Sequence, residues 1–320
     1  MGRRAVLIAV LGLCGLPAAA SARPPVRPVL PPTQASIDLR LEGVAAGGVL
    51  ARTRWVVRGT VTPYVPGQTV TVRLRRSGHK LLIKRLSIER SGTTGTFALE
   101  YRTSVAGRIV VSASHRATPE MATAIAAVRR VDVLPRYAVL GTRGPAVRLL
   151  RTRLARRGYV VNSSDRFDLR MARAVTAFRK LTGMPRTAVA DERVFRRLAR
   201  GEGGFRVRYP SHGRHVEGDL THQVLALIDV GRAARLYPMS SGAPATPTIL
   251  GNFSVYAKTP GTNQKGMIYS SYFIRGFAVH GYIDVPVYPA SHGCLRVPPE
   301  EAISIYAWIR IGTRVDTYYR

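Results

Sequence analysis

Cysteine is almost absent from this chain of 320 residues, which contains only Cys14 and Cys294. Long apolar runs are absent as well, because no stretch after the N-terminal segment approaches the roughly 20 apolar residues of a membrane-spanning helix. Acidic residues are scarce, with 18 Asp and Glu against 49 Lys and Arg. We therefore expect no transmembrane segment and a strongly basic protein.

The N-terminus has the pattern of an export signal. Two arginines, the short apolar stretch 5–16 and the small residues 20–22 predict a signal peptide over 1–22 that is cleaved after Ala22. Cleavage removes Cys14. We expect the signal to export the protein to the cell wall or to the periplasmic or extracellular side of a bacterial envelope. The prolines that follow predict an extended tether over 23–35.

The net charge is +31, or +29 once the two arginines of the signal are removed. Such a charge attracts polyanions. For an exported protein these are wall polymers or phospholipid headgroups, so we expect anionic cell-wall polymers as partners and no nucleic acid. Only five of the 49 basic residues are lysine, and the basic residues are spread over every segment. A genome-wide arginine bias that produces a solvated basic surface is the alternative.

Residues 36–134 are rich in short β-type runs. Segments such as 69–74 and 96–101 are separated by turn signals at Pro66-Gly67 and Ser77-Gly78. About seven short strands in about 100 residues predict an all-β immunoglobulin-like sandwich. Because the segment contains no cluster of catalytic residue types, we interpret it as a spacer or binding module.

Residues 137–200 change to helical periodicity. A helix opens at Gly144-Pro145, a second spans about 168–181, and a third begins at Asp191, which together predict a small three-helix bundle. The segment resembles the peptidoglycan-binding module of wall enzymes at Leu140-Gly141, Val147, Leu150, Leu154, Gly158-Tyr159, Ala174-Val175, Phe178 and Asp191. The resemblance implies wall binding, and a helical spacer is the alternative.

The cysteine that remains after cleavage is Cys294, fourteen residues after His280. A lone thiol outside the cytoplasm is open to oxidation, so we interpret it as a reagent. A loop with two prolines separates the two residues and could return the imidazole to the sulfur. We expect Cys294 to be a nucleophile whose pKa is lowered by an adjacent imidazole, as acyl transfer requires. His280 is the better candidate for the general base, because His292 lies only two residues from the thiol.

The segment 205–320 resembles the L,D-transpeptidase catalytic domain of the YkuD type. The matching blocks are Gln223-Val224-Leu225, Ser240-Ser241-Gly242, Thr246-Pro247, Gly251-Asn252-Phe253, His280-Gly281, Ser291-His292-Gly293-Cys294-Leu295-Arg296 and Gly312-Thr313-Arg314-Val315. The resemblance implies a mainly-β catalytic domain, and the whole chain is then a multidomain protein. Because all of these blocks follow Gly204, we expect the isolated fragment 205–320 to be acylated by a carbapenem.

The resemblance also implies roles for individual residues. His280 is the base, the carbonyl of Gly281 orients its ring, and the backbone amides of His292, Gly293 and Cys294 form the oxyanion hole. Ser291 and Arg296 are expected to contact the substrate. Arg296 would bind a carboxylate of the wall peptide, or it would brace the loop through hydrogen bonds.

The implied activity is the crosslinking of peptidoglycan stem peptides through an acyl-enzyme on Cys294, with carbapenem β-lactams as inhibitors and no cofactor or metal. An L,D-carboxypeptidase, which uses water as the acceptor, is the alternative with the same chemistry. A non-catalytic wall-binding protein is an alternative of another class. A zinc site made by His280, His292 and Cys294 is a third alternative. No CxxC or HExxH spacing in the sequence supports it.

Overall fold

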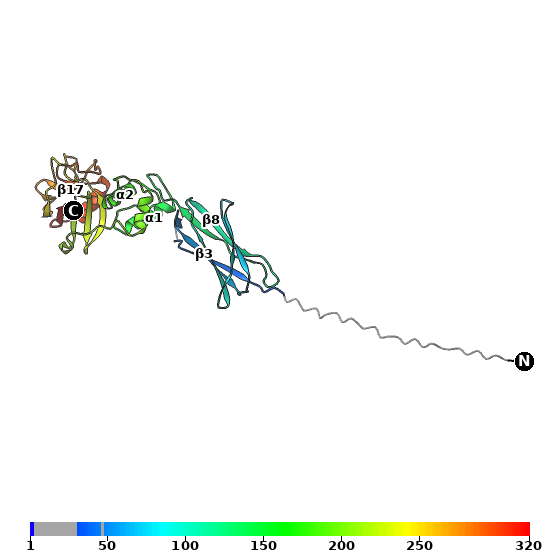
Figure 1. Ribbon diagram of the computed structural model, residues 1–320. Helices are drawn as coiled ribbons and strands as arrows, with labels where there is room; N and C mark the ends of the chain where they lie inside the picture. Colours follow the sequence, from blue (N-terminus) through cyan, green and yellow to red (C-terminus); the bar gives the residue numbers. More distant parts are fainter. Residues whose placement is uncertain (3–30, 46–47) are drawn as a thin grey trace.

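The computed structural model describes residues 1–2, 31–45 and 48–320. The predicted signal peptide, apart from its first two residues, and the predicted tether up to residue 30 lie outside the described residues. A β-rich region, a helical region and a second β-rich region follow one another along the molecule in chain order (Figure 1). Within the described ranges, no helix is long and apolar enough to cross a membrane.

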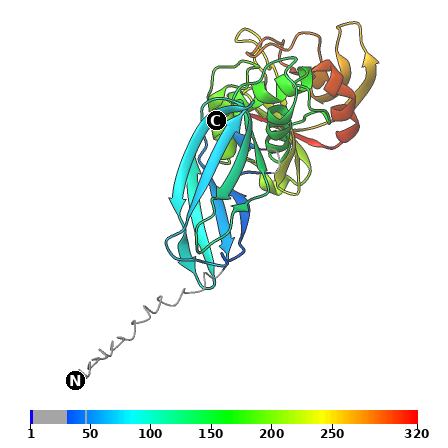
Figure 2. The same cartoon turned by 90° about the vertical axis from the view of Figure 1, so that its right-hand side faces the viewer.

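The N-terminal β-rich region contains two sheets (Figure 2). One has the strand order β1-β3-β7-β6; the other has the order β2-β10-β8-β4-β5, with β9 paired to β8. The strands are β1 (Ser36–Glu42), β2 (Val49–Leu50), β3 (Trp55–Thr62), β4 (Thr69–Arg76), β5 (His79–Ser87), β6 (Glu89–Ser91), β7 (Thr94–Tyr101), β8 (Gly107–His115), β9 (Ala124–Ile125) and β10 (Arg129–Leu134).

Alternating residues of these strands form one apolar core. In β3, Trp55, Val57 and Val61 are buried, whereas Arg58 is exposed, which is the period of two expected for a strand with one buried face. The same buried cluster contains Val57 from one sheet and Val72 from the other. The region is therefore β-rich as predicted, and its immunoglobulin-like character stays a prediction.

The helical region contains α1 (Pro145–Ala155), α2 (Leu169–Leu181) and α3 (Glu192–Ala199). The sequence explains where two of these helices begin. The carboxylate of Asp168 accepts the amide of Met171 at 2.9 Å, and that of Asp191 accepts the amide of Val194 at 3.0 Å. Such N-terminal caps satisfy amides that have no partner inside the helix. The apolar faces of all three helices then pack into a common core.

The C-terminal region has two further sheets, with the orders β13-β12-β11-β19-β14 and β15-β16-β17-β18. Its elements are η1 (Pro210–His212), β11 (His215–Asp219), β12 (Val224–Asp229), β13 (Arg232–Pro238), β14 (Gly251–Ser254), β15 (Ala257–Thr262), β16 (Ile268–Ile274), β17 (Phe277–Gly281), β18 (Leu295–Val297), α4 (Pro299–Trp308) and β19 (Arg314–Tyr318).

Strand β12 is buried on both of its faces. Leu225 and Leu227 belong to the core of the C-terminal region. Val224, Ala226 and Ile228 point the other way and belong to the core of the helical region. The uninterrupted apolar run of this strand is therefore explained by cover on both sides. The helical and C-terminal regions share a core.

Polar contacts reinforce this junction. Lys180, in the last turn of α2, is only 2% exposed, and its Nζ donates to the carbonyls of Gln223 at 3.1 Å and Met239 at 2.9 Å. Arg170 of the same helix donates to the buried carboxylate of Glu301 at 2.6 Å. A buried ammonium ion needs such acceptors because it has left water.

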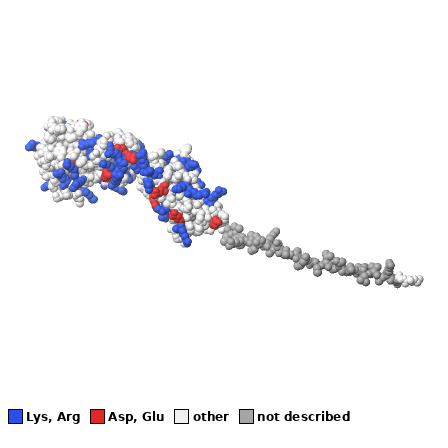
Figure 3. Space-filling view, in the orientation of Figure 1, with Lys and Arg blue, Asp and Glu red and all other residues white. Residues whose placement is uncertain are grey.

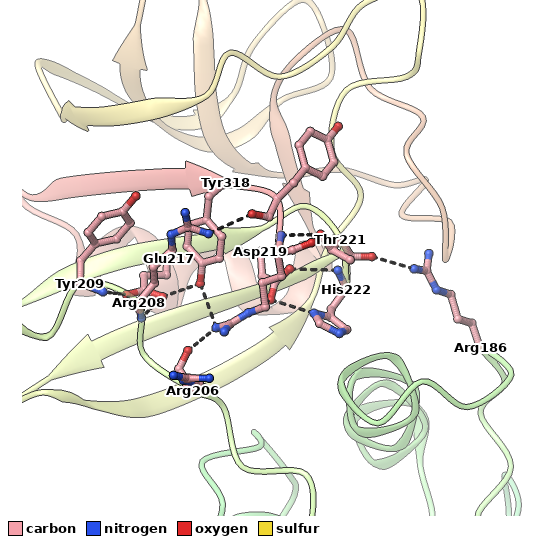
Figure 4. Close-up of polar contacts among 11 residues, drawn as sticks. Arg186, Arg206, Arg208, Tyr209, Glu217, Asp219, Thr221, His222 and Tyr318 are labelled. Carbon is pink, nitrogen blue, oxygen red and sulfur yellow. Dashed lines mark hydrogen bonds and ion pairs between the residues drawn. The ribbon is translucent and has the colours of Figure 1, made fainter.

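Arg186, which follows α2, makes a third contact with the C-terminal region (Figure 4). Its guanidinium donates to the carbonyl of Thr221 at 3.0 Å. Close by, the buried carboxylate of Asp219 binds the imidazole of His222 at 2.9 Å and the guanidinium of Arg320 at 2.6 Å. This polar cluster connects β11, the turn that follows it and the chain terminus beside the helical region.

Candidate active site

Strands β17 and β18 bring His280 and Cys294 together. They pair in parallel, with His280 opposite Arg296, and Cys294 directly precedes β18. Residues two apart in an extended chain point to the same face, so Cys294 is expected on the face that Arg296 shares with His280. All three line one cavity of about 510 Å³.

The hydroxyl of Ser291 closes the turn before Cys294. It donates to the carbonyl of Cys294 at 2.6 Å and accepts the amide of Gly293 at 3.1 Å, and the residue is buried. Ser291 also lines the cavity that contains Cys294, so its expected contact with substrate stays a prediction. The Gly293 amide is likewise engaged, which leaves the amides of His292 and Cys294 as donors for an oxyanion.

Glycine at position 293 is required by the turn. Its φ is +103°, a backbone conformation that side chains disfavour, and an added Cβ would lie 2.2 Å from the ring of Phe277. Any larger residue would therefore push the nucleophile loop away from β17. The contribution of Gly293 is the shape of the loop.

The segment 240–248 supports this loop from its other side. The amide and carbonyl of Ser240 bond to the carbonyl and amide of Arg296 at 3.0 and 2.9 Å. The hydroxyl of Thr248 donates to the carbonyl of Gly293 at 2.9 Å. These bonds join the loop to the segment that follows β13, in which the carbonyl of Met239 accepts from Lys180.

The imidazole of His280 is oriented by its neighbour. Its Nδ1 lies 2.8 Å from the carbonyl oxygen of Gly281. A carbonyl only accepts, so Nδ1 carries the proton and Nε2 keeps a free lone pair. An added Cβ at Gly281 would lie 2.6 Å from the Cβ of Ala302 in α4, so this close backbone approach also needs glycine.

Burial keeps both reacting groups neutral. It lowers the pKa of His280 to about 4, and it raises the pKa of Cys294 above its ordinary value despite an opposing hydrogen bond from the backbone of Ala278 and the nearby positive charge of Arg296. The expectation that an adjacent imidazole lowers the pKa of the thiol is therefore wrong for the resting site. The thiol donates to the carbonyl of Gly276, with the sulfur 3.8 Å from the oxygen.

Arg296 lies along the cavity wall. Its guanidinium carbon is 4.1 Å from the centre of the Tyr282 ring, and its side chain forms no hydrogen bond or ion pair with the described residues. Stacking on an aromatic ring leaves the donors of a guanidinium free for a planar anion. His292 also lines the cavity, and its side chain is exposed.

Sequence reasoning missed several residues of the cavity. Phe277, Tyr282 and Lys265 line it together with the expected residues. Tyr282 lies two residues after His280, and a strand period of two would have pointed to it. Lys265 comes from a turn between β15 and β16, and nothing in its local sequence indicates this position. Within the described chain, no group of three or more His, Cys, Asp or Glu residues is arranged to hold a metal.

Comparisons with known proteins agree with this geometry. The family model of the L,D-transpeptidase catalytic domain, YkuD, matches residues 213–316, and that of a peptidoglycan binding domain, PG_binding_1, matches residues 143–198. The crystal structure of an L,D-transpeptidase from Xylanimonas cellulosilytica is 33% identical, with 58% of this chain and 98% of that chain covered and a TM-score of 0.54. The chain belongs to the L,D-transpeptidase family. No curated protein sequence matches it.

Other L,D-transpeptidase structures match a smaller part. The Ldtfm–avibactam carbamoyl enzyme is 27% identical over 33% of this chain and 48% of that chain, with a TM-score of 0.30. An Enterococcus faecium L,D-transpeptidase mutant is 24% identical over 33% of this chain and 50% of that chain, also with a TM-score of 0.30. This chain thus spans about half the length of those two relatives.

Proposed function

We propose that this L,D-transpeptidase crosslinks peptidoglycan through an acyl-enzyme on Cys294. The observation that carries the proposal is the parallel pairing of β17 and β18, which gives the thiol of Cys294 and the imidazole of His280 a common cavity. A nucleophile and a base at one cavity, with the base oriented by a third group, are the requirements of nucleophilic acyl transfer.

The first step acylates the enzyme. In a stem peptide, an amide bond joins the L-centre of a diamino acid to the following D-alanine. The sulfur of Cys294 attacks the carbonyl carbon of this bond. The thiol proton passes to Nε2 of His280, which is neutral above about pH 4 and has its Nδ1 held by Gly281. The amides of His292 and Cys294 stabilise the oxyanion. His280 then protonates the departing D-alanine amine, and a thioester remains.

The second step transfers the acyl group. An amine of a second stem peptide attacks the thioester carbon and gives a proton to His280, and the sulfur leaves and recovers that proton. The new amide bond is the crosslink. With water as the acceptor, the same steps give L,D-carboxypeptidase action, and mass spectrometry of wall fragments after incubation with the protein distinguishes the two products.

Arg296 is proposed to bind a carboxylate of the stem peptide. Its guanidinium is available because no described side chain neutralises it, and the Tyr282 ring holds its plane at the cavity wall. A guanidinium can form two parallel hydrogen bonds with one carboxylate, which orients the ligand as well as attracting it. Arg296 would therefore place the donor peptide relative to Cys294.

The upstream regions and the cell envelope complete the proposal. The protein is exported by its signal peptide, the helical region binds peptidoglycan, and the immunoglobulin-like N-terminal region is a spacer or binding module. The match to a peptidoglycan binding domain and the basic net charge support attachment to the wall and its anionic polymers. Inhibition by β-lactams such as carbapenems follows from the same proposal, because the strained lactam carbonyl would acylate the thiol of Cys294.

Intact-protein mass spectrometry with a carbapenem tests the nucleophile. The wild type should gain the mass of one inhibitor molecule, Cys294→Ala should gain none, and Cys294→Ser should react almost undetectably. Circular dichroism confirms that each variant is folded. Acylation of a folded Cys294→Ala variant would falsify covalent catalysis by this residue.

A pair of histidine variants tests the base. His280→Ala should slow acylation by roughly 10²–10⁴-fold, the range for loss of a positioned proton acceptor. His292→Ala should have a smaller effect because its side chain is exposed and only its amide is used. The assignment is wrong if the order of the two effects is reversed in folded proteins.

A further inference from the structure

A second cavity, of about 340 Å³, lies between the N-terminal β-rich region and the helical region. Leu50 and Thr53 line it from the β-rich side. Leu149 of α1 and Phe195 of α3 line it from the helical side and make part of its wall apolar. The cavity is remote in sequence from Cys294, and none of its lining residues belongs to the candidate active site.

Arginine dominates the charge of this cavity. Arg136, Arg153, Arg196 and Arg200 line it, and no acidic residue is among its described lining residues. The nearby carboxylate of Glu192 is already bonded to Arg136 at 3.0 Å. Basic side chains are frequent on the visible face of the helical region (Figure 3). The four arginines named above line a single cavity. Such a concentration of positive charge attracts anions more strongly than a dispersed surface charge does.

Two donor atoms in this group are buried without an acceptor among the described residues. They are Nη1 of Arg153 and Nε of Arg136. Burial, together with the neighbouring charges of Arg157 and Arg156, lowers the pKa of Arg153. Buried donors are normally hydrogen-bonded, and a buried charge is normally paired. The missing partner is therefore an acceptor, and a negatively charged one suits the surroundings.

We propose that this cavity binds an oxyanion group, a phosphate or a carboxylate, of an anionic polymer through Arg136, Arg153, Arg196 and Arg200. Guanidinium groups fit both anions because their donors form pairs of parallel hydrogen bonds. Arg153 and Arg136 supply donors that have no acceptor among the described residues, and the exposed Arg196 and Arg200 add positive charge to the lining. The inference goes beyond the acyl-transfer proposal, because it gives the junction a binding role that does not involve Cys294.

Isothermal titration of the full chain at 0.15 M salt tests the site. The probes are inorganic pyrophosphate, poly(glycerol phosphate) and polyglutamate, and the two polymers distinguish a phosphate from a carboxylate source. The cavity variant is Arg153→Gln with Arg200→Gln. The matched control is Arg143→Gln with Arg156→Gln, which removes the same charge from exposed arginines of the helical region that do not line the cavity.

We expect saturable binding of at least one probe by the wild type. The cavity variant should bind it at least about tenfold more weakly, and the control should stay within about threefold. Equal weakening by both variants means diffuse electrostatic attraction and overturns the proposal, as does the absence of saturable binding to all three probes. If the cavity variant unfolds, Arg196→Gln with Arg200→Gln replaces it, because both side chains are exposed and have no described partner. Carbapenem acylation, measured in parallel, should be unchanged.

Discussion

The helical region and the N-terminal β-rich region both precede the catalytic domain, but they are joined to it differently. The helical region shares an apolar core with β12 and β13, and its Lys180 donates to the carbonyls of Gln223, directly before β12, and Met239, directly after β13. The N-terminal region contributes Leu50 and Leu134 to the same apolar cluster, and its Arg52 binds Glu192 of α3. Among the described residues, it forms no hydrogen bond or ion pair with the catalytic domain.

This difference shows that order in the chain is a poor guide to structural dependence. The proposed catalytic residues all follow Gly204, yet β12 of the same region is covered on one face by the helical region that precedes it. We infer that the helical and C-terminal regions form one cooperative unit, and that the N-terminal region is joined to it by a smaller contact that includes Leu50, Leu134 and a partly exposed ion pair. The shared core predicts instead that residues 205–320 are destabilised on their own, and acylation of this fragment decides between the two predictions.

Truncation should produce the largest difference. The fragment 205–320 should lose most of its carbapenem acylation, at least about tenfold, because Val224, Ala226, Ile228 and Leu236 become exposed. Burying one large aliphatic side chain is worth about 1.5–3 kcal/mol, and a typical domain has only about 5–15 kcal/mol of stability. The fragment 137–320 is the control and should react within about twofold of the full chain. Equal activity and equal melting temperature of the two fragments would contradict the shared core.

Substitution of Lys180 tests the polar part of the same junction. Lys180→Met fills the space but leaves the carbonyls of Gln223 and Met239 without their donor. Each unpaired carbonyl should lower the free energy of unfolding by about 1–3 kcal/mol. Part of this loss is offset because the variant no longer buries an ammonium group. Met239 precedes Ser240, which bonds to Arg296 beside the nucleophile. We expect acylation to slow by about tenfold in Lys180→Met and less in Lys180→Gln, which keeps a donor. Equal slowing of acylation in Lys180→Met and Lys180→Gln would mean that the hydrogen bonds of Lys180 do not matter and that only its packing does.

The pH dependence of stability sharpens the comparison further. Burial lowers the pKa of Lys180 to about 7, whereas the unfolded chain keeps the ordinary value of 10.5. Between these values the unfolded state binds a proton that the folded state lacks. Folding is therefore penalised as pH falls from about 10.5 towards 7, and the penalty is complete below about 7. Urea unfolding of the fragment 137–320 should show stability rising over this window, and Lys180→Met should lose that part of the rise.

The smallest effects are expected from the carboxylates at the two junctions. Glu301→Gln weakens a pair with Arg170 in which the carboxylate side chain is 5% exposed, and should cost about 1–2 kcal/mol after allowance for the more exposed arginine. Glu192→Gln affects partly exposed pairs and should cost about 0–1 kcal/mol, with no change in acylation. Chemical denaturation of the full chain measures both. A larger loss from Glu192→Gln would place the stronger junction on the N-terminal side.

Local sequence determined much of this protein. The positions of helices followed from Pro145, Asp168 and Asp191, because caps and apolar spacing act within one turn of a helix. The nucleophile and base were predicted from Cys294 and His280 because an unpaired thiol and an imidazole carry their chemistry with them. Their catalytic roles remain predictions for the experiments above.

Only the tertiary structure decided how these residues are used. The pKa values of Cys294 and His280 depend on burial, which is set by residues distant in sequence, so local sequence pointed to a thiolate that the resting site does not favour. The hydroxyl of Ser291 bonds within the turn before Cys294, and the local sequence did not indicate these bonds. The cover on β12 was visible in the sequence only as an uninterrupted apolar run. Which region supplies that cover is a long-range choice, and packing of the whole chain determines it.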